Sequence, residues 1–179
     1  MMIQFSQWLK IQRLSLFLYL AFSVFLLVYA LGFLSDVYIF YTYGSDELEN
    51  FYHYMQGINS GLLWKAILVI VFALVLFVLE LNKYPAGLFT LIVVVFIAAI
   101  GLVISANSFI ELMEARQQYT VLDLSPLNRY IERETIRYRY STTIFDFGLV
   151  VYTLMFFSSL FMAATVTRNA IKVTVKEKP

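Results

Sequence analysis

Long apolar runs alternate with shorter polar segments along the whole chain. The runs cover residues 14–34, 62–81, 87–113 and 145–166. A helix rises about 1.5 Å per residue, so a run of about 20 residues crosses the roughly 30 Å hydrocarbon core of a bilayer. The pattern predicts an all-α integral membrane protein in which a single domain, residues 1–179, forms a bundle of four transmembrane helices.

The segments between the runs differ greatly in length. Segments 35–61 and 114–144 are long enough to form sizeable loops, whereas only NKYPA, residues 82–86, separates the second run from the third. Such a short connection makes those two helices an antiparallel hairpin. Both long loops then lie on one side of the membrane, and both ends of the chain lie on the other.

The second loop contains SPLNRYIERETIRYRY, residues 125–140. Ser125 suits the N-cap of a helix, and Pro126 suits the first helical position, where its missing N–H costs nothing. Apolar side chains would fall on one side of this helix and arginines on another. We therefore predict a short amphipathic helix on the surface of the second loop.

Lysine and arginine positions predict which side of the membrane each loop faces, because cytoplasmic segments carry the excess of these residues. The extracytoplasmic side would hold five arginines, all of them in segment 114–144, where they are interspersed with acids. We expect cytoplasmic termini, a cytoplasmic tail at 167–179 and two extracytoplasmic loops. The cytoplasmic basic residues would be Lys10, Arg13, Lys83, Arg168, Lys172, Lys176 and Lys178.

Composition narrows the possible chemistry. Hydrophobic residues make up 61% of the chain, above the roughly 45–50% of soluble domains, which supports the membrane assignment. A net charge of +1 without a basic cluster argues against nucleic acid. The chain has no cysteine and one histidine, His53, which excludes disulfides, cysteine-ligated metals and a haem held by two histidines of one chain. We expect no cofactor and no metal.

Two charged residues, Lys65 and Asp146, lie within the predicted spans. Burying a charge in a membrane costs free energy, so such residues usually have a partner of opposite charge. Helical rise places Lys65 and Asp146 at similar depth, just inside the outer boundary of the membrane. We predict an ion pair between them, from the second helix to the fourth. The alternatives are that Lys65 extends to the outer headgroups or takes part in transport.

The third helix carries small residues along one face, where they allow another helix to approach closely. We interpret this face as a packing seam against helices of this chain or of another subunit; a polar pathway is the alternative. The seam consists of Ala98, Gly101, Ser105 and Ser108.

The first outer loop contains YIFYTYGSDELENFYHYMQ, residues 38–56, which is both aromatic and acidic. Its tyrosines suit an aromatic belt at the level of the lipid headgroups. Its acids could also dock on the arginines of the second loop and form an outer cap, or bind an external partner, or remain solvated. The residues concerned are Asp46, Glu47 and Glu49 in the first loop and Arg129, Arg133 and Arg137 in the second.

Three functions remain open. The first is a non-catalytic accessory or assembly subunit of a larger membrane complex, bound to lipids and to partner subunits through its helices and outer loops. The second is a homo-oligomeric channel or small transporter, its outer half lined by Lys65, Asp146, Asn107 and Ser105. The third is an enzyme acting on lipid or wall precursors, its active groups being Glu111 and the three arginines of the second loop. No nucleophile–base pair supports the third, so we favour the first. The absence of cysteines and of glycosylation acceptors suggests a bacterial cytoplasmic membrane.

Overall fold

The fold consists of four long helices joined by shorter elements. The computed structural model describes residues 2–34, 37–43, 45–81, 88–132 and 141–176. The elements are α1 (Met2–Gly32), α2 (Ile39–Tyr43), α3 (Asp46–Leu81), α4 (Leu88–Val121), the 3₁₀ helix η1 (Ser125–Arg129) and α6 (Thr143–Lys176).

The four long helices are long and apolar enough to cross a membrane. Their candidate spans are Ile11–Gly32, Asp46–Leu79, Leu91–Val121 and Thr143–Arg168. Large apolar side chains point outward along these spans, including Phe17, Trp64, Val103 and Phe157. This inverted exposure is what a lipid environment requires. The predicted all-helical protein with four spans is thus confirmed, and the chain is a multi-pass membrane protein.

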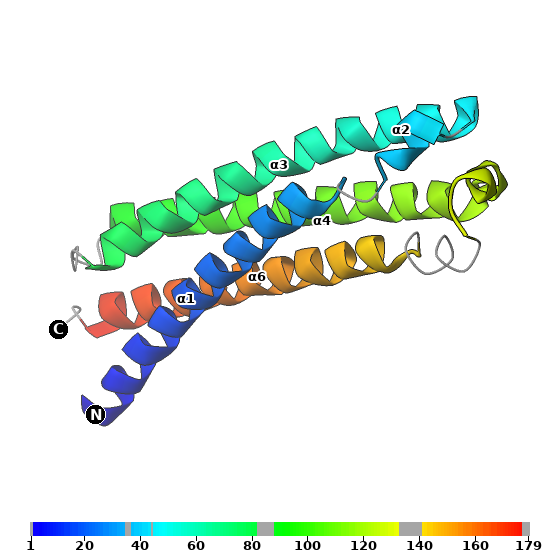
Figure 1. Cartoon of the computed structure of the whole chain (residues 1–179). Coiled ribbons are helices and arrows are strands. Elements are labelled where there is room, and N and C mark those ends of the chain that lie inside the picture. Colours follow the sequence, from blue (N-terminus) through cyan, green and yellow to red (C-terminus); the bar gives the residue numbers. More distant parts are fainter. Residues whose placement is uncertain (1, 35–36, 44, 82–87, 133–140, 177–179) are drawn as a thin grey trace.

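The long helices run alternately up and down (Figure 1). The start of α1, the end of α3, the start of α4 and the end of α6 lie at one end of the bundle, whereas α2 and η1 lie at the other. α4 packs along α6, and α1 crosses obliquely over both α3 and α6. α3 and α4 contact each other less than these pairs do, although they are neighbours in the sequence.

The long helices extend beyond the apolar runs that predicted them. α3 begins at Asp46, so residues 46–61 are helical rather than part of a loop. α4 continues to Val121, and α6 continues through residues 167–176 of the expected tail. Three acids in the first turn of α3 favour its early start, because they interact with the positive end of the helix dipole.

The predicted surface helix at 125–140 lies only partly within the described residues. A single 3₁₀ turn, Ser125–Arg129, is present, and residues 133–140 lie outside the described part of the chain. Ser125 is not a capping residue. Instead its N–H and its hydroxyl donate hydrogen bonds of 2.9 and 2.8 Å to Asp123. These two bonds stabilise the ionised carboxyl and lower the pKa of Asp123.

The helical extensions build a small folded unit at one end of the spans, which we call the cap (residues 37–43, 45–61 and 112–132). It has a buried core of its own that continues into the start of α6. Four of its ten residues are aromatic, and two of these, Phe40 and Phe51, come from residues 38–56. The core residues are Val37, Phe40, Leu48, Phe51, Met55, Leu112, Ala115, Tyr119 and Leu127, together with Phe145 of α6.

Candidate functional site

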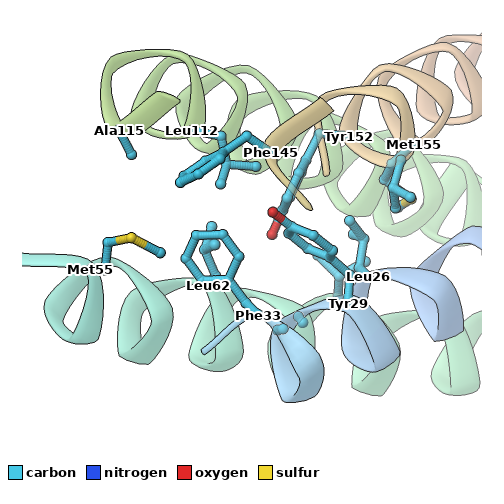
Figure 2. Close-up of a cluster of buried hydrophobic side chains, with 14 of the residues drawn as sticks. Leu26, Tyr29, Phe33, Met55, Leu62, Leu112, Ala115, Phe145, Tyr152 and Met155 are labelled. Carbon is cyan, nitrogen blue, oxygen red and sulfur yellow. The ribbon is translucent and has the colours of Figure 1, made fainter. Parts of the chain in front are cut away.

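An aromatic column joins the interior of the bundle to the core of the cap. It begins with Tyr152 and Tyr29, whose ring centroids are 6.3 Å apart, and continues through Phe33 to Phe145. The rings of Phe145 and Tyr119 are 5.3 Å apart, and Tyr119 in turn contacts rings of α2 and α3. Figure 2 shows four rings of this column, those of Tyr152, Tyr29, Phe33 and Phe145. The cap and the spans therefore share one continuous core.

The cap also carries aromatic rings on its outside. Tyr38, Tyr41, Tyr52 and His53 form what we call the tyrosine cluster, with ring centroids 5.7 to 6.1 Å apart. Tyr38 and Tyr41 are 58% and 47% exposed, so these rings contact each other without being buried. The carboxylate of Glu49 lies beside the cluster, 3.8 Å from the His53 ring.

Among the described residues, the contact between the two outer loops is aromatic, and the predicted ionic docking stays a prediction. Tyr43 of α2 lies against Tyr130 beside η1, with ring centroids 4.7 Å apart. Asp46, Glu47 and Arg129 are exposed, and the described residues include no ion pair between them. Arg133 and Arg137 lie outside the described residues.

The predicted ion pair between Lys65 and Asp146 is not formed, because each residue has a different partner. Lys65 Nζ donates to both carboxylate oxygens of Glu111, at 2.6 and 2.7 Å. Arg116 Nε donates to Asp146 Oδ1 at 2.7 Å, and the Thr142 hydroxyl donates to Oδ2 at 2.9 Å. The first pair joins α3 to α4, and the second joins α4 to α6. Both pairs lie where the apolar spans give way to the cap.

The Lys65–Glu111 ion pair joins α3 to α4 near the boundary of the apolar spans. The ion pair is one lateral link between α3 and α4, and the ring contact of Phe51 with Tyr119 in the cap is another. Trp64, the neighbour of Lys65, is 69% exposed and suits the interfacial region of a bilayer. The pair therefore marks the boundary between the hydrocarbon and the cap.

Reversing this ion pair should test its contribution. Lys65→Glu alone places two carboxylates together and should destabilise the protein, whereas Lys65→Glu with Glu111→Lys should recover most of the loss. We expect a coupling free energy of about 1 kcal/mol, since both side chains are partly exposed. Thermal unfolding in detergent micelles measures it. Glu49→Gln, which removes a partly exposed contact with His53 and one of three first-turn acids of α3, is the control and should lower stability less than Lys65→Glu. Additive effects of the two reversed charges would contradict the pairing.

The small-residue face of α4 packs against helices of this same chain. Ala98, Gly101, Ser105 and Ser108 are all buried. A Cβ at Gly101 would lie 2.6 Å from the Ser159 hydroxyl oxygen and 2.9 Å from that of Tyr19. The seam is thus the surface on which α6 packs against α4 and to which the Tyr19 side chain of α1 reaches. Asn107, predicted to line a pore, is instead exposed on the outside of the bundle.

Buried hydroxyl groups inside the bundle were missed from the sequence. Tyr19 and Tyr29 interrupt an apolar run, and this was the available signal, but their inward direction could not be read from it. Several of these groups have no hydrogen-bond partner among the described residues. The unpartnered atoms are the hydroxyl oxygens of Tyr19, Tyr29 and Ser158, and Oδ1 of Asn59, whereas the Tyr152 hydroxyl lies close to that of Ser108.

The described residues contain no group of three histidine, aspartate or glutamate side chains that could hold a metal ion. Comparisons with known proteins give no relative, because no family model, no curated protein and no solved structure matches this chain. The physical properties of the cap and of the bundle interior are therefore the basis for functional inference.

Proposed function

We propose that this protein is a non-catalytic accessory or assembly subunit of a larger membrane complex, and that the tyrosine cluster of the cap is its principal binding surface. The observation that carries the proposal is the exposure of this cluster. Tyr38 and Tyr41 do not belong to the buried core of the cap, although Tyr52 packs partly against that core. Exposed aromatic rings on a folded unit are typical of surfaces that a partner covers.

The chemistry of the cluster favours a protein partner. Tyrosine provides a large apolar ring together with a hydroxyl group, and it is enriched among the residues that dominate binding energy. The neighbouring acids of α3, Asp46, Glu47 and Glu49, form a negative rim that would select a partner surface carrying lysine or arginine. The outward-facing apolar side chains of the spans are available to lipids and to a partner's transmembrane helices.

The proposal includes an orientation and a location. The clustering of basic residues near both termini supports cytoplasmic termini, with the cap on the extracytoplasmic side. The absence of cysteine suits a bacterial cytoplasmic membrane. The cap would then present the tyrosine cluster to subunits or extracytoplasmic domains just above the lipid surface.

Purification from native membranes in a mild detergent tests the binding role. We expect the tagged protein to retain a foreign subunit at fixed stoichiometry, measured by the mass of the intact complex. Tyr38→Ser with Tyr41→Ser should release that subunit, because truncating one aromatic hot spot costs at least about 2 kcal/mol, or about 30-fold in affinity.

A matched control separates this surface from general loss of apolar area. Val121, at the cap end of α4, is 81% exposed and does not belong to the tyrosine cluster, so Val121→Ser should retain the subunit.

The orientation is tested separately by labelling. The chain has no cysteine, so an impermeant maleimide should label the Thr42→Cys variant in intact cells if the cap is extracytoplasmic. A clean homo-oligomer, or equal retention by all variants, would overturn the proposal.

A further inference from the structure

A polar side chain, Asn107 of α4, faces outward within the apolar part of the spans. It lies four residues, or about 6 Å, from Glu111 toward the middle of the bundle, and the Lys65–Glu111 ion pair marks the boundary of the hydrocarbon. The carboxamide of Asn107 has no hydrogen-bond partner among the residues that the structure describes. It therefore points toward lipid at a depth where no water can supply the missing bonds.

The outward faces of the other three long helices look different in the same half of the spans. They present large apolar side chains, namely Val24 and Phe25 of α1, Leu68 and Val71 of α3, and Leu154 and Phe157 of α6. Such faces suit lipid alone. Polar side chains within a span cost free energy there and are usually turned toward a hydrogen-bonding partner. Asn107 thus distinguishes the outer face of α4 as the place where a further helix would dock.

The chemistry of this face defines what would bind it. A carboxamide has two N–H donors and an acceptor oxygen, so it fits the amide or hydroxyl side chain of another helix. Hydrogen bonds of this kind hold helices together in lipid, where burial of apolar surface supplies little driving force. Val103 and Ile110 are exposed on the same face, one turn to either side of Asn107, and would pack against the docked helix. Ala99 and Ala106 are exposed beside them and leave room for the close approach that a short side chain needs.

Glu114 decides between a second copy of this chain and a foreign helix. It follows Asn107 by seven residues, so it shares the same face of α4 and lies about 10 Å nearer the cap. It is exposed and has no ion-pair partner among the described residues. Two copies of α4 meeting about a twofold axis would bring two Glu114 carboxylates toward each other, which opposes binding. A helix with lysine or arginine at that level would instead be attracted.

We propose that α4 is the helix by which this protein holds the transmembrane part of its foreign subunit. The docked helix carries a hydrogen-bonding side chain opposite Asn107 and a lysine or arginine at its cap-side end, opposite Glu114. The inference rests on the proposed function, because it concerns the same subunit. That subunit would then be held at two places, by the tyrosine cluster above the lipid and by α4 within it.

Site-specific photo-cross-linking in native membranes tests this inference. Benzoylphenylalanine takes the place of Val103, which is 60% exposed, in the tagged full chain, and the membranes are irradiated before detergent is added. We expect a cross-link to the foreign subunit. Mass spectrometry should place it in an apolar run of about 20 residues that contains a hydrogen-bonding side chain and has lysine or arginine at one end.

Substitutions at Asn107 test the hydrogen bond itself. Asn107→Leu should lower the cross-linked fraction about threefold when the subunit is limiting, which corresponds to the loss of one interhelical hydrogen bond of about 0.6 kcal/mol. Asn107→Gln keeps the carboxamide and should retain more of the product. An Asn107→Leu protein that cross-links as well as the parent would contradict the proposed contact.

Leu154 provides the matched control for the probe position. It is 42% exposed on the outer face of α6, so benzoylphenylalanine in its place should react with lipid and not with the subunit. Equal yields from the two positions, a cross-link to a second copy of this chain, or no cross-linked protein at all would overturn the inference. If the Tyr38→Ser, Tyr41→Ser protein still releases the subunit while position 103 gives no cross-link, the proposed function stands and only the role of α4 fails. If no foreign subunit is found, both fail.

Discussion

Replacing Phe145 with alanine should unfold the cap. Phe145 is fully buried where α6 begins, and its ring lies 5.7 Å from that of Phe33 and 5.3 Å from that of Tyr119. It is thus the link through which the aromatic column passes from the spans into the cap. Removing a buried phenylalanine side chain typically costs about 3–5 kcal/mol, because burial and packing are both lost.

Hydrogen–deuterium exchange localises the effect. In the Phe145→Ala variant, backbone amides of residues 46–61 should exchange at least about a hundredfold faster, since a loss of 3 kcal/mol in local stability corresponds to roughly that factor. Amides in the middle of the spans should change much less, because the bilayer or micelle keeps those helices formed.

Phe147 provides a control of the same residue type on the same helix. It is 54% exposed, so Phe147→Ala leaves the cap core intact and should leave exchange at 46–61 nearly unchanged. If Phe145→Ala and Phe147→Ala behaved alike, the cap would owe its stability to something other than the aromatic column.

The spans were predictable because lipid imposes a simple rule on them. Every backbone group must be paired within its own helix, so a long apolar run has only one good conformation. The cap follows no such rule. Residues 46–61 were read as a loop because they are rich in tyrosine and acids. However, Leu48, Phe51 and Met55 are buried at helical spacing, and this periodicity was present in the sequence.

The ion pairs show a second limit of sequence reasoning. Helical rise gave the depth of Lys65 and Asp146, but depth alone does not say which way a side chain points around its helix. Glu111 and Arg116 lie near the same boundary and face the neighbours that they bind. For the same reason the sequence did not show that Tyr19 and Tyr29 point into the bundle, because this depends on how α1 crosses α6.

Among the described glycines, Gly148 is the one at which an added Cβ would be most crowded. A Cβ at this position would meet Tyr29 at its hydroxyl oxygen and Cζ, with Cε1 at 2.8 Å. The Tyr29 ring has little freedom to move, because the rings of Phe33, Phe147 and Tyr152 surround it at 5.5 to 6.3 Å. Gly148→Ala should therefore force α1 away from α6.

We expect Gly148→Ala to lower the free energy of unfolding by about 1–3 kcal/mol, the usual cost of overpacking a core, as measured by denaturation in micelles. The gain in helix propensity opposes this loss by at most about 1 kcal/mol. Gly57→Ala isolates that gain, since no atom lies within 4 Å of the added Cβ, and it should stabilise the protein. Tyr29→Leu removes the ring that the added Cβ would meet. This substitution should therefore lower the free energy of unfolding less in the Gly148→Ala protein than in the parent protein. Equal stability of the Gly148 and Gly57 variants would mean that α1 does not seat Tyr29 against α6.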